Sequence, residues 1–114
     1  MTTVARFEIR HTQFLNHLGE PTEPLPEFAR DPKNLIPFYR AMVLTRTYDA
    51  KAVALQRTGQ LGTVASSLGQ EAIGAVVGGL MRPEDVFLST YREAGAQMAR
   101  GVTMTELLRY WSGD

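Results

Sequence analysis

The stretch from Gly59 to Arg92 constrains the fold more than any other part of this sequence. It reads GQLGTVASSLGQEAIGAVVGGLMRPEDVFLSTYR and opens with a glycine-rich loop. A helix of small residues is expected over about 68–80, and a turn over 81–85 interrupts it. The apolar run Val86–Leu88 predicts a short buried strand. Helix, turn and strand in this order predict an α/β protein, here mainly helical with one short strand.

Three glycines inside the expected helix predict a close packing contact. Ser67 and Gln70 have the spacing of a capping box, which places the helix start near Leu68. The glycines are Gly74, Gly78 and Gly79. Each costs about 1 kcal/mol of helix stability relative to alanine. We therefore expect this backbone to approach another backbone closely, in a helix–helix or subunit contact, rather than to bind phosphate.

A long helix is predicted to precede this stretch. It can begin near Asn34, which can cap free N–H groups, or at Asp31–Pro32, and Gly59 can end it in the left-handed conformation. Apolar residues at three- and four-residue steps predict a buried stripe: Leu35, Phe38, Tyr39, Met42, Val43, Tyr48, Ala52 and Leu55. Charged residues mostly mark the other face: Arg40, Arg46, Asp49, Lys51 and Arg57. No chemistry is assigned to either face.

Two short helices are expected after the strand. The first spans about 93–100 with Gly101 behind it, and the second spans about 104–111. Thr103 and Glu106 form a capping box at the start of the second helix. One strand has no partners for a sheet, so the sequence predicts a fragment or a chain that completes its core with other chains.

Residues 1–30 are expected to form an extended arm, and residues 31–114 the first, incomplete part of a larger domain. Val4, Phe7 and Ile9 give the arm apolar side chains without a local core, so we expect it to lie on another surface. Closely spaced prolines exclude a helix or central strand across residues 21–26. His11 and His17 have no carboxylate cluster nearby, and no metal site is assigned to them.

Composition excludes several classes of function. The chain has 12 basic and 12 acidic side chains and a net charge of zero, which gives no footprint for nucleic acid. It contains no cysteine, so thiolate and disulfide chemistry are absent. Residues 1–20 lack the pattern of a secretory signal, and the longest apolar helical run, residues 72–80, is too short to span a membrane. A cytoplasmic location is the default.

Tyr91 and Arg92 are the candidate binding residues. Arginine presents a planar, permanently charged fork that meets phosphate oxygens two at a time, and an adjacent ring can line the ligand. In open α/β sheets, ligands bind outside the carboxyl ends of strands. The alternative is structural, with Arg92 in a surface ion pair and Tyr91 half buried.

Six segments occur in the order found in one enzyme family: LIPFYRAMVLTRTYD, LQRTGQLGT, GQEA, the turn ending in ED, STYREAG and RGVTMTELL. Over residues 35–114 the chain resembles the amino-terminal portion of the α subunit of the E1 component of 2-oxo-acid dehydrogenase complexes. The arm sequence FEIRHTQFL is similar to that of some bacterial members.

The resemblance implies the beginning of a thiamine-diphosphate-binding fold. The implied enzyme oxidatively decarboxylates pyruvate, or alternatively a branched-chain 2-oxo acid, and transfers the acyl group to the lipoyl group of the E2 acyltransferase. It works as an α2β2 heterotetramer with an E1 β subunit and holds the cofactor at the α–β interface. Tyr91 and Arg92 match the family's Tyr-Arg pair, so Arg92 would clamp the diphosphate and Tyr91 would contact the cofactor beside it.

No catalytic residue and no metal ligand is assigned within the chain. The family's Mg²⁺ ligands, a Gly-Asp-Gly step and a later Asn, belong further downstream than Gly113–Asp114, and a catalytic glutamate belongs to the β subunit. Val64 replaces a frequent aromatic, and Ala65 replaces the histidine of animal pyruvate dehydrogenases, which favours a bacterial-type subunit. The 114 residues alone are not expected to be active. The alternative is a non-catalytic, truncated E1-like interaction module.

Overall fold

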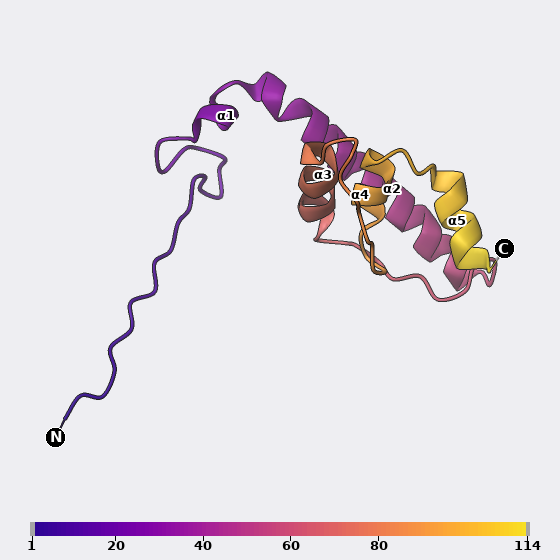
Figure 1. Cartoon of the computed structure of the whole chain (residues 1–114), viewed down its shortest axis with the longest axis horizontal. Coiled ribbons are helices and arrows are strands. Elements are labelled where there is room, and N and C mark those ends of the chain that lie inside the picture. Colours follow the sequence, from indigo (N-terminus) through magenta and orange to yellow (C-terminus); the bar gives the residue numbers. More distant parts are fainter. Residues whose placement is uncertain (1, 114) are drawn as a thin grey trace. The chain divides into compact units, whose positions relative to one another are not determined.

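The computed structural model describes residues 2–113, which form two units, one ending at Pro32 and the other starting at Lys33. The elements are α1 (Glu27–Arg30), the 3₁₀ helix η1 (Pro32–Asn34), α2 (Ile36–Arg57), α3 (Glu71–Leu80), α4 (Ala94–Ala99) and α5 (Met104–Ser112). In the second unit, α3, α4 and α5 are arranged in chain order along α2 (Figure 1). None of the helices in the described range is long and apolar enough to cross a membrane. The functional division into 1–30 and 31–114 stays a prediction.

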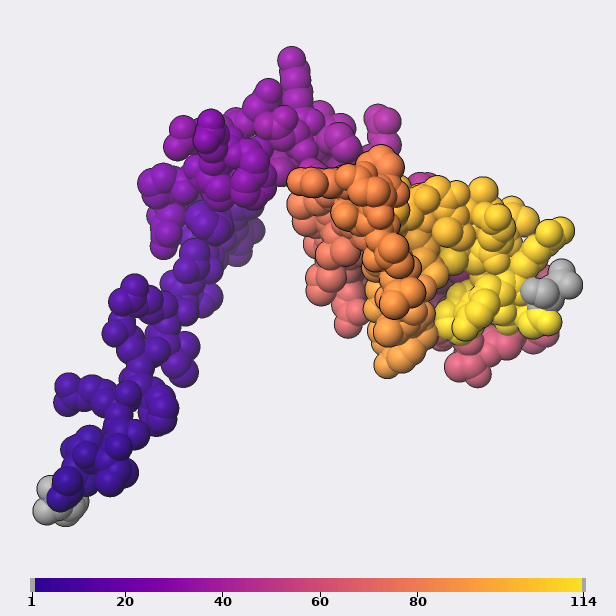
Figure 2. All heavy atoms as spheres, in the orientation of Figure 1, coloured from indigo at the N-terminus to yellow at the C-terminus, as the bar shows by residue number. Residues whose placement is uncertain are grey.

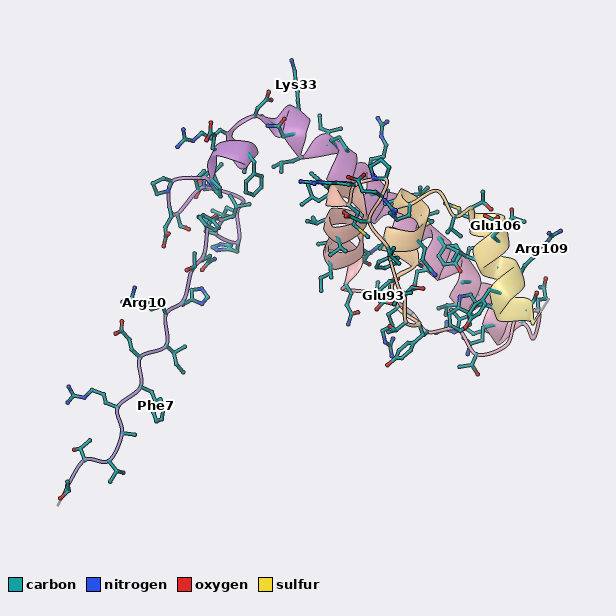
Figure 3. The ribbon with its side chains drawn as sticks, in the orientation of Figure 1. Phe7, Arg10, Lys33, Glu93, Glu106 and Arg109 are labelled. Carbon is teal, nitrogen blue, oxygen red and sulfur yellow. The ribbon has the colours of Figure 1, made fainter. Side chains whose placement is uncertain are left out.

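The first unit is an extended segment followed by a compact turn and α1. Phe7 and Arg10 project from the extended part (Figure 3), and the Phe7 side chain is exposed. Asn16 organises the turn, because its Oδ1 accepts hydrogen bonds from the N–H groups of Leu18 and Glu20 at 2.9 and 3.0 Å. Gly19 takes the left-handed φ of 79° that this turn needs. The expectation that the segment lies on another surface stays a prediction.

Helix α2 ends as the sequence predicts. The N–H of Gly59 donates to Gln56 O, and that of Gln60 donates to Leu55 O, at 3.0 and 2.9 Å. With Gly59 at a φ of 71°, these bonds form a Schellman motif that satisfies the last carbonyls of the helix. The start lies two residues beyond Asn34, since η1 precedes α2.

The predicted stripe of α2 is buried only in part. Tyr48 and Ala52 are buried and pack with Leu107 of α5 to form the centre of the core. Tyr39 and Val43 are exposed, whereas Asp49, expected on the polar face, is buried. The buried line therefore runs through Thr45, Tyr48, Asp49 and Ala52 and mixes polar with apolar side chains.

The glycines of α3 lie against α4, which confirms the predicted helix–helix contact. A Cβ atom built on Gly78 would lie 2.8 Å from Ala96 Cα and 2.8 Å from Ala99 Cβ. One built on Gly74 would lie 3.1 Å from the Ala96 nitrogen. Because real Cβ atoms are not found that close to backbone atoms, only glycine at position 78 permits this approach.

The start of α3 differs from the sequence expectation. The capping box of Ser67 and Gln70 is wrong: α3 begins at Glu71, and no side chain caps it. The Ser67 hydroxyl donates to Asp49 Oδ1 at 3.2 Å instead. By contrast, the capping box at α5 is confirmed, since Thr103 Oγ1 accepts from the Glu106 N–H at 3.2 Å and Glu106 Oε2 accepts from the Thr103 N–H at 2.7 Å.

The expected strand at Val86–Leu88 is not confirmed. No strand occurs among residues 2–113, and the side chains of Val86 and Leu88 are 82% and 88% exposed rather than buried. An isolated extended segment has no neighbour to pair with its backbone groups, which explains why no ladder forms. The preceding turn is fixed by Arg100, whose guanidinium donates to the carbonyls of Arg82, Pro83 and Asp85 at 2.7, 3.2 and 2.8 Å.

We expect Gly78→Ala to lower the free energy of unfolding by roughly 1–3 kcal/mol, because the added methyl group overpacks the contact with α4. Gly79→Ala is the matched control. Its Cβ meets the edge of the Phe38 ring at 2.9 Å, and a side chain can move away. There the helix propensity of alanine should offset the contact. Urea unfolding followed by circular dichroism compares the variants, and equal stabilities would contradict the role of Gly78.

Candidate functional site

Tyr91 and Arg92 lie at the end of the segment that joins α3 to α4. This segment, orange in Figure 2, lies at the surface of the second unit. Both side chains are exposed, and the Arg92 guanidinium carbon lies 5.2 Å from the centre of the Tyr91 ring. Arg92 Nη1 donates a hydrogen bond to Ser66 O at 2.6 Å, which joins the pair to the glycine-rich loop.

The described residues do not neutralise the charge of Arg92. Within residues 2–113, no carboxylate forms an ion pair with its guanidinium. Ser66 O occupies one N–H of the five that an arginine side chain carries. The remaining donors and the full positive charge suit an anionic ligand such as a phosphate. The surface ion pair considered for Arg92 is absent from the described part of the chain.

Glu93 fixes the backbone on which the pair sits. Its carboxylate accepts from the Thr90 N–H and hydroxyl, each at 2.8 Å, and from the Arg92 N–H at 3.3 Å. These donors, the Thr90 hydroxyl first, hold the pKa of Glu93 below its ordinary value. Glu93 is the residue directly before α4. The turn into α4 therefore presents Tyr91 and Arg92 from a hydrogen-bonded frame.

The loop between α2 and α3 is held at both of its ends. The Val64 N–H donates to Gln56 Oε1 at 2.9 Å, and the Gly62 N–H donates to Trp111 O at 3.0 Å. Nearer α3, Asp49 accepts from Ser66 and Ser67, and Glu71 accepts from the Gly69 N–H at 3.0 Å.

Asp49 is the site residue that sequence reasoning missed, because its position among charged residues suggested a solvated face. Its spacing to Thr45 and Ala52, on the buried side of α2, was the signal that could have indicated burial.

Glu71 is buried and paired with Arg46, whose Nε donates to Glu71 Oε1 at 2.8 Å. This hydrogen bond is the main cause that lowers the pKa of Glu71 from 4.5 to about 2, and the Gly69 N–H contributes. The ion pair ties the first residue of α3 to α2 and the loop.

A cavity of about 270 Å³ lies beside Tyr91. Its walls come from α2, the loop, the segment before α4, and helices α4 and α5, and they include Ala65, Gln97 and Trp111. Tyr48 also lines the cavity; it is 4% exposed, and its hydroxyl has no hydrogen-bond partner. Burial raises the pKa of Tyr48. Ligand pockets typically have volumes of about 300–1,000 Å³. The cavity formed by these walls alone lies just below that range.

The described residues contain no group of three or more His, Cys, Asp or Glu side chains that could hold a metal ion. His11 Nε2 lies 3.4 Å from Gln13 Oε1, in an exposed part of the first unit. Carboxylates at the site instead accept hydrogen bonds from the backbone, as Asp49, Glu71 and Glu93 do. The role of Tyr91 and Arg92 in binding a ligand stays a prediction.

Comparison with known proteins gives the class. The chain belongs to the dehydrogenase E1 component family, which it matches over residues 39–114. The match covers the loop, the Tyr91–Arg92 pair and helices α3 to α5. The resemblance inferred from the sequence motifs is thereby confirmed.

The relatives are α subunits. The chain is 34% identical over 98 residues to the pyruvate dehydrogenase E1 component subunit alpha of Acholeplasma laidlawii, covering 85% of this chain and 27% of that protein. It is 32% identical over 111 residues to the same subunit of Bacillus cereus, covering 96% of this chain and 29% of that protein. It is 35% identical over 75 residues to the 3-methyl-2-oxobutanoate dehydrogenase subunit alpha of Mycobacterium tuberculosis, covering 66% of this chain and 20% of that protein.

The chain thus spans less than a third of the length of these relatives. No solved structure gives a significant match.

We expect Glu71→Gln to lower the thermal unfolding midpoint at pH 7. The pKa of Glu71 in the folded chain, about 2, lies below its ordinary value of 4.5. The ionised carboxylate therefore stabilises the fold above about pH 4.5, and this contribution is lost as the pH falls toward 2. The difference between the chain and the variant should shrink over that range. Thermal melts followed by circular dichroism from pH 7 to pH 2 measure this difference in midpoint. Glu84→Gln, at an exposed position, is the control. Equal midpoints of the two variants at pH 7 would contradict the role of the ion pair.

Proposed function

We propose that this chain serves as the amino-terminal part of the α subunit of a pyruvate dehydrogenase E1 component. The observation that carries the proposal is the unneutralised Arg92 guanidinium beside Tyr91, in a chain that belongs to the E1 family over residues 39–114. In this function the complete enzyme oxidatively decarboxylates pyruvate and transfers the acyl group to the lipoyl group of E2. The 114 residues alone carry out no turnover.

Pyruvate is the proposed substrate, and a branched-chain 2-oxo acid is the alternative. The two relatives named for pyruvate dehydrogenase match 85% and 96% of the chain, whereas the relative named for 3-methyl-2-oxobutanoate dehydrogenase matches 66%. The choice between the two substrates rests on the extent of these matches.

The proposed cofactor is thiamine diphosphate, which supplies the electron sink for decarboxylation when it is bound. The residues present fit its diphosphate end, because Arg92 offers free N–H donors and a positive charge without a competing carboxylate. Tyr91 lines the cavity of about 270 Å³ and would contact the cofactor there. That volume supports a shared site in which a partner subunit supplies the remaining walls. Mg²⁺ ligands are proposed outside this segment.

The proposal also covers the fold, the partner subunits and the location of the complete enzyme. The complete fold would be an α/β thiamine-diphosphate-binding fold in which Val86–Leu88 finds strand partners. The E1 β subunit would complete an α2β2 heterotetramer, and the lipoyl domain of E2 would receive the acyl group. The proposed location is the cytoplasm, with neither nucleic acid nor membrane as a partner.

A second candidate is a non-catalytic E1-like module that binds a β-like subunit. The outer face of α3 favours it, because apolar side chains there remain exposed: Ile73, Val76, Val77 and Leu80. Apolar faces of this kind are typical of protein contacts. Dimerisation through the glycines of α3, the other form of this alternative, is disfavoured because those glycines already pack on α4 and on Phe38.

We expect Arg92→Ala to weaken thiamine diphosphate binding at least tenfold in the complete α2β2 enzyme, because a hydrogen-bonded charge partner of the diphosphate is removed. Isothermal titration calorimetry in the presence of Mg²⁺ measures the affinity. Arg109→Ala, which removes an arginine from α5, is the control and should leave the affinity unchanged. An unchanged affinity in Arg92→Ala would remove Arg92 from the site.

We expect the 114-residue chain to co-elute with an E1 β subunit in size-exclusion chromatography without restoring decarboxylation if it is a binding module. The enzyme proposal predicts decarboxylation only when the longer α subunit is supplied. Turnover by the short chain with E1 β would contradict both statements. Comparing pyruvate with 2-oxoisovalerate in the complete enzyme then separates the two substrates.

A further inference from the structure

Asp49 is a buried carboxylate whose partners all belong to one loop. Its residue is 5% exposed. Oδ1 accepts from the Ser67 N–H at 2.7 Å and from the Ser67 hydroxyl at 3.2 Å, and Oδ2 accepts from the Ser66 hydroxyl at 2.7 Å. No basic side chain in the described range forms an ion pair with it. A buried carboxylate is tolerated only where hydrogen bonds replace its lost hydration, so these three bonds require the loop to stay in place.

The peptide group between Ser66 and Ser67 connects Asp49 to Arg92. The N–H of Ser67 and the C=O of Ser66 belong to one planar unit, and the peptide bond that joins them is trans, since none of the bonds between the described residues is cis. In a trans peptide, these two groups point in opposite directions. The N–H faces Asp49 at 2.7 Å, and the C=O accepts from Arg92 Nη1 at 2.6 Å. The carboxylate and the guanidinium therefore bind the two ends of the same peptide dipole.

Through this peptide, Asp49 affects both the position of Arg92 and the strength of its hydrogen bond to Ser66 O. A carboxylate on the N–H side polarises the peptide and makes its carbonyl oxygen a stronger acceptor for the guanidinium. Both hydrogen bonds involve an ionised group, which strengthens each relative to a neutral pair. Rotation of the peptide would break both at once. Asp49, fixed on the long helix α2, thus sets the position of the oxygen that holds Arg92 Nη1.

We propose that Asp49 is a positioning residue that orients the Arg92 guanidinium for an anionic ligand, acting through the Ser66–Ser67 peptide. Glu93 fixes the backbone of Arg92 from the other side, since it accepts from the Arg92 N–H. The backbone of Arg92 is thereby bonded to Glu93 and its guanidinium to Ser66 O. That the ligand is a diphosphate rests on the proposed function; the link between Asp49 and Arg92 does not.

The rival role for Asp49 is general stability of the loop. Asp49→Asn separates the two roles, because it keeps the size of the side chain and one carbonyl acceptor for the Ser67 N–H but removes the charge. Loss of loop stability would affect the whole second unit. Loss of positioning would loosen the guanidinium and weaken anion binding only while Arg92 is present.

The first test uses the chain itself and needs no cofactor. In ¹⁵N NMR spectra, Asp49→Asn should lower the heteronuclear NOE of the Arg92 side-chain Nε–H group, which reports faster motion. The Arg109 side chain serves as the internal reference and should not change. Hydrogen exchange of the Ser67 amide should accelerate in the same variant. An Arg92 NOE that is unchanged in Asp49→Asn, with a folded spectrum, would overturn the proposal.

The second test measures thiamine diphosphate affinity by calorimetry in the complete α2β2 enzyme. Asp49→Asn should weaken binding roughly three- to tenfold, a coupling of the size expected for residues in one hydrogen-bond network. In the Arg92→Ala background, the same substitution should cause no further loss. An equal loss in both backgrounds would show that Asp49 does not act through Arg92 and would overturn the proposal.

One control variant and a comparison of the two test variants distinguish the outcomes. Thr103→Ala removes the cap of α5 and should reduce stability without changing affinity, so it reports what a purely structural loss does. If Arg92→Ala leaves the affinity unchanged, the proposed cofactor role fails, while the NMR test still decides the link between Asp49 and Arg92. If Arg92→Ala weakens binding and Asp49→Asn does not, the proposed function stands and the positioning role fails.

Discussion

Close packing of three helices through small side chains is the constraint on which the rest of this structure depends. Gly78 brings α3 against α4, and Gly95 brings α4 against α2, where a Cβ atom would lie 2.8 Å from Thr45 Oγ1. The Thr45 hydroxyl is occupied locally, because it donates to Ala41 O at 2.8 Å. Larger residues would move α4 outward. Since Arg92 lies two residues before α4, its distance from the loop is set by this contact.

Acidic side chains fix the loops and turns between the packed helices. Several acidic side chains among the described residues accept hydrogen bonds from backbone N–H groups, and of these Glu71 also pairs with a basic side chain. Such charge-assisted bonds are stronger than neutral ones and define loop geometry that apolar contacts leave free. Examples, each carboxylate with the residues whose N–H groups donate to it, are Asp49 with Ser67, Glu71 with Gly69, Asp85 with Arg82, Glu93 with Thr90 and Arg92, and Glu106 with Thr103. A consequence is that Arg92 keeps its charge available.

The sequence predicted those features that depend on local or one-dimensional signals. The end of α2 at Gly59 and the cap at Thr103 follow from residue types at fixed spacing, and the glycines of α3 implied a close contact before the partner helix was known. Tyr91 and Arg92 were identified as candidates in the same way, and their role in binding stays a prediction.

The sequence-based predictions that were wrong or not confirmed have a common cause. Ser67 fits a capping box by spacing, but a carboxylate 18 residues earlier competes for its hydroxyl and wins because it is charged and buried. Val86–Leu88 has the composition of a strand, yet pairing requires a second strand that the described residues do not supply. Asp49 looked like a surface residue because its burial depends on the loop that folds over it. Periodicity does not report contacts between distant segments.

The unpaired segment Val86–Leu88 favours association between molecules and so lowers solubility. Extended backbone with free N–H and C=O groups and outward apolar side chains is a template for edge-to-edge association between molecules. Glu84 and Asp85 stand immediately before it, and charges beside an apolar run act as gatekeepers against such stacking. The turn before Val86 therefore combines the geometry that Arg100 fixes with charges that disfavour association of neighbouring copies.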